Sequence, residues 1–242
     1  MKRILQITLF VFVSLFFLSS LFASDNNNST KVYGGAGYFM PGIQILNISN
    51  LNSKLQDKNY PKLSSSFTSF GGGGHAFIAN FVVGGEGHGL FGKDVTNDKY
   101  TLNMSAGYGI FDLGYVIISK AGFNLYPIVG IGGSGLSLKI TERTIPTFDE
   151  ILDNPKGHLE LSSGSLLLHF AVGLDYIVSF GSDGDSRGGV LLGLRAGFTY
   201  TPVAGDWEMG DVKIAGGPET GVTGAYIRLL VGGGGAAFSS VK

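Results

Sequence analysis

The chain has no cysteine among its 242 residues, and this absence excludes several kinds of exported protein. Without cysteine there is no disulfide framework, no thiolate metal site and no acylated lipoprotein cysteine. The chain also lacks an excess of charge of either sign, because it has 17 basic and 18 acidic residues. It therefore has no basic surplus of the kind that indicates binding to nucleic acid. Proline is scarce and tryptophan occurs once. We expect a domain that is stabilised by its own packing and hydrogen bonds.

The first residues indicate export. A lysine and an arginine follow the first methionine, an apolar run covers residues 4–22, and Ala23 precedes the polar stretch SDNNNST. This order predicts a secretory signal peptide over residues 1–23. An uncleaved membrane anchor is the alternative, because the run is nearly long enough to span a bilayer. Residues 24–242 then have the length of a single domain.

Glycine is the most conspicuous component, with 40 residues and none of the period of collagen. The glycines lie inside alternating segments such as FGGGGHAF, VVGGEGHGL and LLVGGGGAAF. Glycine weakens an ordinary soluble strand. In a small barrel it relieves crowding inside and permits the bends that closure requires. The composition therefore favours a barrel over a flat sheet.

Residues 165–180, SLLLHFAVGLDYIVSF, alternate between apolar and other side chains. Leu168 and Phe170 fall on one face, and His169 and Asp175 fall on the other, which is the pattern of a β-strand. A soluble sheet would turn the apolar face to a core. A membrane barrel would turn it to lipid and the polar face inward. We expect the barrel, with lipid on Leu168 and Phe170 and the lumen on His169 and Asp175.

Continued along the chain, the alternation predicts eight strands. They cover residues 31–41, 66–78, 81–91, 99–118, 123–140, 163–180, 189–203 and 224–238. Long connections (42–65, 92–98, 141–162 and 204–223) alternate with short ones (79–80, 119–122 and 182–188). The predicted fold is all-β: an eight-stranded antiparallel up-and-down transmembrane β-barrel with short periplasmic turns and longer extracellular loops.

The segment YTLNMSAGYGIFDLGY changes phase in its middle. Apolar residues from Tyr100 to Ile110 share one parity, and the other parity takes over at Phe111. We predict a bulge near Ile110. A turn at the same place would instead give nine strands and a soluble sandwich.

Aromatic residues lie near strand ends on the apolar face: Tyr115, Phe123, Tyr176, Phe180 and Tyr200. They suit an interfacial girdle, although β-propensity alone also enriches aromatic residues in strands. The last strand, AYIRLLVGGGGAAF, ends in Phe238, and four residues follow it. This whole-chain pattern resembles the small outer-membrane β-barrels of the OmpA/OmpX-like class, whose last strand closes on an aromatic residue as an assembly signal. The four extra residues depart from that signal. The resemblance implies contact with outer-membrane lipids and with the barrel-assembly machinery.

The inward face carries most of the charged side chains of the predicted strands: His75, Glu86, His88, Asp112, His169, Asp175, Arg195 and Arg228. With a seventh turn centred near Asp185, Asp175 lies opposite Arg195, while His75 and Glu86 become diagonal neighbours. Buried charges must be paired. We expect an ion-pair network that fills an interior too narrow for a channel. An acid/base or metal site made from three histidines and Glu86 is the alternative.

The loops carry three further signals. ILNISNLNSKLQ, within residues 42–65, predicts one or two helical turns. Thr147 and Glu150 form a capping box ahead of a short helix that Asn154-Pro155 would end. Trp207, in GDWEMGD, is a contact residue for a partner or a lipid headgroup if it is exposed, and otherwise packs its own loop onto the rim.

The sequence predicts an outer-membrane barrel with a structural, adhesive or surface-interaction role, a monomer that contacts any extracellular partner through its loops. No catalytic motif is present, so we expect neither an enzyme nor a bound cofactor or metal. A narrow pore or small-ligand carrier is the alternative function. A soluble periplasmic β-sandwich is the alternative fold.

Overall fold

The structure is a computed structural model that describes residues 30–120, 122–143, 147–153, 158–183 and 186–240. The predicted signal peptide and the predicted helix stop at Asn154-Pro155 lie outside the described residues. Among the described residues, no helix has the length and apolar character needed to cross a membrane.

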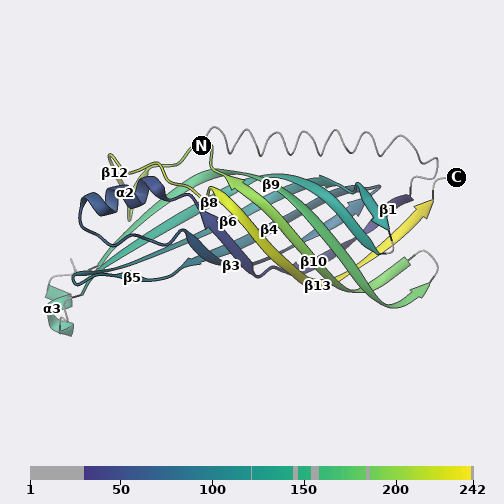
Figure 1. Ribbon diagram of the computed structural model, residues 1–242, viewed down its shortest axis with the longest axis horizontal. Helices are drawn as coiled ribbons and strands as arrows, with labels where there is room; N and C mark the ends of the chain where they lie inside the picture. Colours follow the sequence, from purple (N-terminus) through teal and green to yellow (C-terminus); the bar gives the residue numbers. More distant parts are fainter. Residues whose placement is uncertain (1–29, 121, 144–146, 154–157, 184–185, 241–242) are drawn as a thin grey trace.

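Eight long antiparallel strands close into a barrel, as predicted (Figure 1). They are β1 (Thr30–Phe39), β3 (Ser66–Ile78), β4 (Phe81–Gly92), β6 (Tyr100–Tyr115), β8 (Phe123–Glu142), β9 (His158–Asp183), β10 (Ser186–Tyr200) and β13 (Gly224–Ser240). Each pairs with its neighbour, and β13 pairs with β1 to close the ring. A closed ring leaves no open edge, so the sandwich alternative is wrong.

The strands are inclined to the barrel axis. The row of paired residues that leaves Ile131 of β8 and passes around the barrel reaches β9 at Val178. Ile131 itself pairs with Leu168 of β9, ten residues away. Such a stagger forces the strands to tilt, and Figure 1 shows them crossing the barrel obliquely.

The first barrel strand is longer than predicted. β2 (Gly42–Leu46) pairs with β13 and β3, the same two neighbours as β1. Pro41 has no N–H to donate, and it separates the two strands. The prediction of a loop that starts at residue 42 is therefore wrong over residues 42–46.

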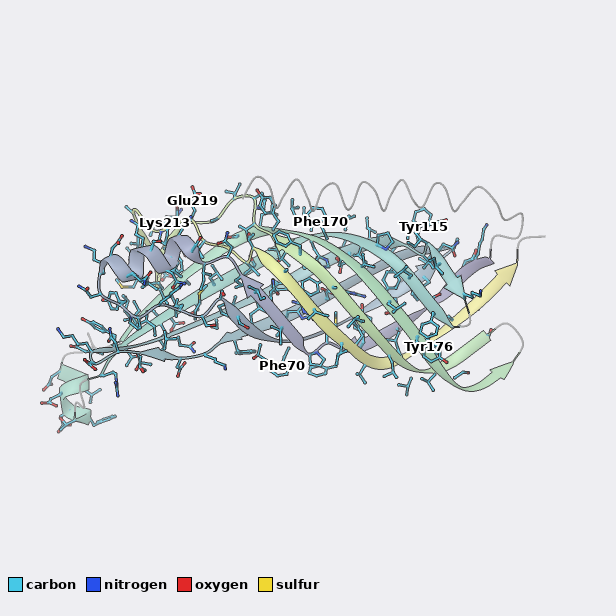
Figure 2. The ribbon with its side chains drawn as sticks, in the orientation of Figure 1. Phe70, Tyr115, Phe170, Tyr176, Lys213 and Glu219 are labelled. Atoms are coloured by element: carbon cyan, nitrogen blue, oxygen red, sulfur yellow. The ribbon has the colours of Figure 1, made fainter. Side chains whose placement is uncertain are left out.

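The outer surface carries a wide apolar belt (Figure 2). Phe70 and Phe170 lie near the middle of the molecule, and Tyr115 and Tyr176 lie toward the end where β13 finishes. Phe81 packs on Tyr115 with ring centroids 5.3 Å apart, and Phe123 stacks on Tyr176 at 4.4 Å. With other outward apolar side chains of the strands, such as Phe111 and Ile131, these aromatic residues form the belt, which is therefore the lipid-facing surface.

Three strands reach past the belt at the end with the long loops. On β8 the outward residues are apolar from Phe123 to Ile131 and then turn small or polar as far as Glu142. Residues 100–109 of β6 and 158–165 of β9 behave in the same way. We call residues 100–109, 132–142 and 158–165 the extension.

The phase change in β6 is not a bulge. β6 pairs with β8 from Tyr100 to Gly114 without a register shift. Leu102 and Met104 point inward, and so does Asp112. The apolar parity changes because the environment does: the extension has water outside and a core inside, whereas the belt has lipid outside and a polar lumen. Both the predicted bulge and the nine-strand alternative are wrong.

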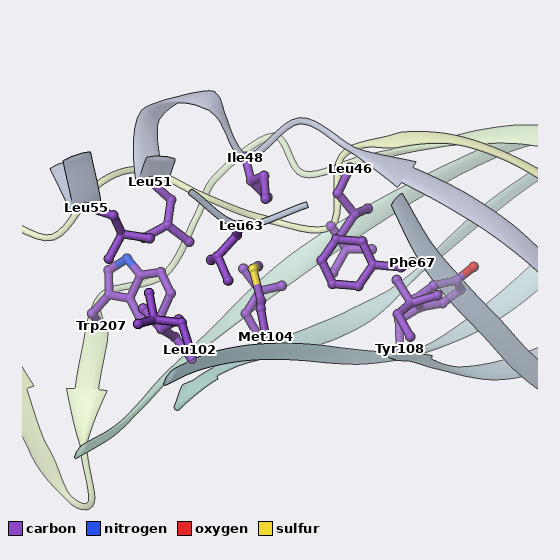
Figure 3. Close-up of a cluster of buried hydrophobic side chains, with 14 of the residues drawn as sticks. Leu46, Ile48, Leu51, Leu55, Leu63, Phe67, Leu102, Met104, Tyr108 and Trp207 are labelled. Carbon is purple, nitrogen blue, oxygen red and sulfur yellow. The ribbon is translucent and has the colours of Figure 1, made fainter. Parts of the chain in front are cut away.

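The core of the extension is covered by two segments. Residues 47–65 contain α2 (Ser49–Asp57), and residues 207–214 form the hairpin of β11 (Trp207–Met209) and β12 (Val212–Ile214). We call these two segments the cap. Leu51 and Leu55 of α2 pack with Trp207 over Leu102 and Met104 (Figure 3). Asn52 fixes the cap, since its Nδ2 donates to the Leu63 carbonyl (3.1 Å) and its Oδ1 accepts from the Leu63 N–H (2.9 Å).

Three short elements complete the fold: β5 (Val95–Thr96), β7 (Ile118–Lys120) and α3 (Phe148–Asp153). α3 lies at the far tip of the β8–β9 connection (Figure 1). Its capping box is confirmed, because the Thr147 N–H donates to Glu150 Oε2 (2.8 Å) and the Glu150 N–H donates to Thr147 Oγ1 (3.3 Å). The hydrogen bonds that the Thr147 N–H and the Thr147 hydroxyl donate to Glu150 Oε2 lower the pKa of this exposed carboxyl.

Candidate functional site

The structure places all eight charged residues singled out in the sequence inside the barrel, and none is more than 7% exposed. They come from six strands: His75 on β3, Glu86 and His88 on β4, Asp112 on β6, His169 and Asp175 on β9, Arg195 on β10 and Arg228 on β13. Glycines on the inward face make room for them. A Cβ on Gly130 would lie 2.2 Å from Asp112 Oδ1, and one on Gly71 would lie 2.1 Å from His88 Nδ1.

Glu86 is the centre of this polar layer. Arg195 Nη1 donates to Glu86 Oε2 at 2.5 Å. Around Oε1 lie His88 Nε2 at 3.3 Å, Arg228 Nη1 at 3.6 Å and His169 Nε2 at 4.0 Å. Arg195 and Arg228, which pair with each other on the neighbouring strands β10 and β13, thus both reach the Glu86 carboxylate across the barrel.

Arg228 is held on every side. Its Nη2 donates to Gln44 Oε1 (2.7 Å) and to the Tyr108 hydroxyl, and its Nε donates to Ser69 Oγ (3.1 Å). The guanidinium also lies over the Tyr226 ring, 3.9 Å from the centroid. These contacts replace the water that the buried cation has lost.

His169 bridges two strands. Its Nδ1 lies 2.7 Å from Asp112 Oδ1 on β6, and its Nε2 lies 2.6 Å from the Tyr226 hydroxyl on β13. Both ring nitrogens therefore have partners. The imidazole acts as a cross-brace of the barrel.

Asp175 does not lie opposite Arg195. β9 and β10 begin their pairing at Asp183 and Ser186, one residue away from the predicted register, and shift by one more residue between Arg187 and Gly189. Asp175 therefore pairs with Gly193. Its Oδ2 accepts a hydrogen bond from the Tyr126 hydroxyl at 2.6 Å and lies 3.3 Å from His75 Nε2. The predicted register on the other side is confirmed, because His75 pairs with Gly84 and Glu86 with Gly73, which makes His75 and Glu86 diagonal.

The sequence reasoning missed the tyrosines of this layer. Tyr38, Tyr108, Tyr126 and Tyr226 all point inward and hydrogen-bond the charged residues. Tyr108 belongs to the apolar parity of residues 100–110 in the sequence analysis, and Tyr126 has no assignment there. Their parity relative to Asp112 on β6, and to the inward Asn124 on β8, was the signal that could have identified them.

The residue types in this polar layer raise the question of a bound metal ion. Glu86, Asp112 and His169 offer ligand atoms that lie within 4.8 Å of one another. The local charge opposes it, because Arg195 and Arg228 already bind Glu86. Like charges about 4 Å apart repel by about 4 kcal/mol at an effective dielectric constant of about 20. The arrangement fits an ion-pair network better than a metal or acid/base site.

The polar layer is enclosed by apolar layers above and below. Toward the long loops lies the core under the cap, which includes Leu90, Leu136 and Leu167. Toward the short turns lies a second apolar cluster, which includes Val82 and Ile177. Among the described residues, packed apolar side chains therefore lie on both sides of the polar layer along the lumen.

Trp207 is not a contact residue on the surface. It is 4% exposed, belongs to the apolar core under the cap, and donates its indole N–H to the Pro218 carbonyl at 2.8 Å. The alternative, a tryptophan that packs its own loop onto the rim, is what the structure contains. The exposed apolar side chains of the loops are others, among them Phe148 and Leu152 of α3.

The closed barrel, the lipid-facing belt and the buried polar layer define a transmembrane β-barrel of the outer-membrane type. No protein-family model matches the chain, and no curated protein matches it. Among solved structures, it is similar to the attachment invasion locus protein Ail of Yersinia pestis, with 10% identity and a TM-score of 0.43. That match covers 86% of this chain and 99% of Ail.

Two further structures show a comparable likeness. The Neisserial surface protein A is 11% identical with a TM-score of 0.35, over 86% of this chain and 98% of that one. The outer membrane protein OprG of Pseudomonas aeruginosa is 10% identical with a TM-score of 0.36, over 87% of this chain and 97% of that one. At these values the resemblance is distant, and the role of each neighbour stays with that neighbour.

Proposed function

We propose that this chain is an outer-membrane anchor that displays a folded extracellular unit, made of the extension and the cap, for adhesive or other surface interaction. The observation that carries the proposal is the apolar core under the cap. A barrel needs only short loops to remain in a membrane. Here three strands continue beyond the lipid belt and build, with α2 and the β11–β12 hairpin, a core of the kind found in water-soluble domains.

The interior supports an anchor more than a pore or an enzyme. The polar layer is paired across the barrel and lies between two apolar layers, so its charges stabilise the closed ring. The protein would act as a monomer without a cofactor, inserted by the barrel-assembly machinery. Its partner contacts would come from the cap, the extension and α3.

The absence of cysteine makes the topology directly testable. Single cysteines would replace Lys213, in the β11–β12 hairpin, and Lys120, in β7 at the opposite end; both positions are exposed. A membrane-impermeant maleimide should label Lys213→Cys on intact cells and Lys120→Cys only after lysis. Labelling of Lys120→Cys on intact cells, or of neither variant, would contradict the proposed display.

The interaction itself needs a second readout. Cells that display the wild-type protein should attach to an epithelial monolayer more than cells that carry the empty vector. A Phe148→Ser, Leu152→Ser variant of the exposed α3 should lose part of that gain, whereas Lys120→Gln should keep it. Equal attachment of all strains would leave a structural role alone.

A further inference from the structure

The outward face of the extension changes from lipid-facing to polar at the upper edge of the belt. Two rows of paired residues cross β6, β8 and β9 there. One row is Ser105, Ser137 and Ser162, and the next row is Asn103, Lys139 and Glu160. Hydroxyl, amide and charged groups thus form a continuous sheet surface above the belt, with a row of glycines between them.

The surface just below these rows is flat. Gly107, Gly135 and Gly164 form a third row across the same three strands. A Cβ on Gly135 would meet nothing within 4 Å, and the contacts of a Cβ on the other two would be ordinary ones. A bulky headgroup can therefore approach the backbone between the belt and the polar rows.

On this surface the acidic side chains accept hydrogen bonds from neighbouring side chains, whereas, among the described residues, the lysines do not take part in such contacts. Asp94 accepts a hydrogen bond from Asn103 Nδ2 at 2.5 Å, and Glu160 accepts one from Ser137 Oγ at 2.9 Å. Lys93 follows the end of β4 beside Asn103, and Lys139 is paired with Asn103 on the other side. Within the described part of the chain, neither ammonium group has a hydrogen bond or an ion pair, and both side chains are exposed.

We propose that this outward face binds the phosphorylated sugar headgroup of an outer-leaflet glycolipid, with Lys93 and Lys139 on its phosphates and the serine rows on its sugar hydroxyls. The occupant follows from position, because the face is continuous with the belt that already contacts lipid. Since two acids offset the two lysines, the attraction is local contact and not a net field. The inference rests on the proposed outer-membrane location.

The test compares two double variants that remove the same charge. Lys93→Gln, Lys139→Gln alters the proposed face, and Lys58→Gln, Lys62→Gln alters two exposed lysines of the cap. Refolded protein would be titrated with a fluorescent bis-phosphorylated lipid A in phosphatidylcholine micelles. We expect binding to the first variant to be about 30-fold weaker than to wild type, at about fivefold per lysine near a membrane surface, and binding to the second to be unchanged.

Several outcomes would overturn the inference. Equal affinity of wild type and Lys93→Gln, Lys139→Gln would do so, and so would an equal loss in the cap variant, which would show general charge attraction. Undiminished binding of dephosphorylated lipid A would remove the role given to the lysines. Competition by inorganic phosphate alone would assign the site to free anions.

The two proposals can fail separately. All variants should give the wild-type heat-dependent gel shift in phosphatidylcholine alone, which shows that they fold. If cysteine labelling contradicts surface display while the lysine-dependent binding remains, the proposed function fails and the headgroup site stands. If labelling supports surface display but binding does not depend on the lysines, the proposed function stands and the headgroup site is wrong.

Discussion

At the scale of single residues, the interior of this barrel depends on the charge of Glu86. Arg195 and Arg228 lie side by side on the neighbouring strands β10 and β13, and both reach this one carboxylate. Replacing a buried anion by its neutral isostere leaves the cations without a counter-charge in a site that water does not reach. The loss is then much larger than the net worth of the ion pair itself.

Glu86→Gln should therefore lower the free energy of unfolding by about 3–5 kcal/mol. The matched control is Lys213→Gln, which removes the ion pair of Lys213 with Asp206 at 3.3 Å, where the two side chains are 71% and 69% exposed. A solvated pair of this kind contributes less than about 1 kcal/mol. Urea unfolding in lipid vesicles, followed by the far-ultraviolet circular dichroism of the barrel strands, measures both. Similar losses in the two variants would contradict the central role of Glu86.

Two glycines of β8 allow the effect of steric crowding on stability to be distinguished from the effect of backbone propensity. A Cβ on Gly130 would lie 2.2 Å from Asp112 Oδ1 and 2.8 Å from the Phe111 carbonyl oxygen, whereas one on Gly133 would meet nothing within 4 Å. Gly130→Ala should cost about 1–3 kcal/mol by overpacking, and Gly133→Ala should stay within about 0.5 kcal/mol of wild type. The same urea unfolding measures the pair. A tolerated Gly130→Ala would mean that the polar layer can shift.

At the scale of elements, the sequence predicts a strand well and predicts its surroundings less well. Alternation places β3, β4 and the inward His169 and Asp175 correctly, because period two is a property of the strand itself. It does not say whether the apolar face meets lipid or a core. Along β6 the apolar side chains change from the outer to the inner face because the strand leaves the membrane. From the sequence alone, this change of parity predicts a bulge.

Strand register and loop packing cannot be predicted from the sequence for a different reason. The shift between Arg187 and Gly189, which moves Asp175 away from Arg195, is an irregularity inside β10, and an alternating pattern carries no signal for it. Trp207 is buried because α2, some 150 positions earlier in the chain, covers it. Contacts of that separation depend on barrel closure, which brings residues 47–65 and 207–214 to the same end.

The cap should unfold before the barrel does. Asn52→Ala removes both hydrogen bonds to Leu63 and leaves a buried N–H and a buried carbonyl without partners, which costs about 1–3 kcal/mol of local stability. Backbone hydrogen exchange over residues 47–65 should therefore accelerate, while exchange in β3 and β4 stays slow. Ser53→Ala, at an exposed position of α2, is the control. Equal acceleration in the barrel strands would show that cap and barrel unfold together.

At the scale of the whole molecule, the lumen is filled by three layers in series. The apolar core under the cap, the polar layer around Glu86 and the apolar cluster of Val82 and Ile177 follow one another along the axis. The polar layer fixes the strands in a closed ring and the apolar layers exclude water from it. The same side chains that stabilise the barrel thus occupy the path that ions would need.

The reconstituted protein should therefore give no steady ion conductance in a planar bilayer. Because the layers lie in series, Asn52→Ala should also remain closed, since loosening the cap leaves the polar layer and the lower apolar cluster in place. The measurement is single-channel recording of protein whose heat-dependent gel shift shows a folded barrel. A steady conductance in wild type that changes in Arg195→Ala or Asp175→Ala would contradict the sealed lumen and support a narrow pore. A conductance that appears only in Asn52→Ala would mean that the cap alone closes the barrel and that the polar layer admits ions.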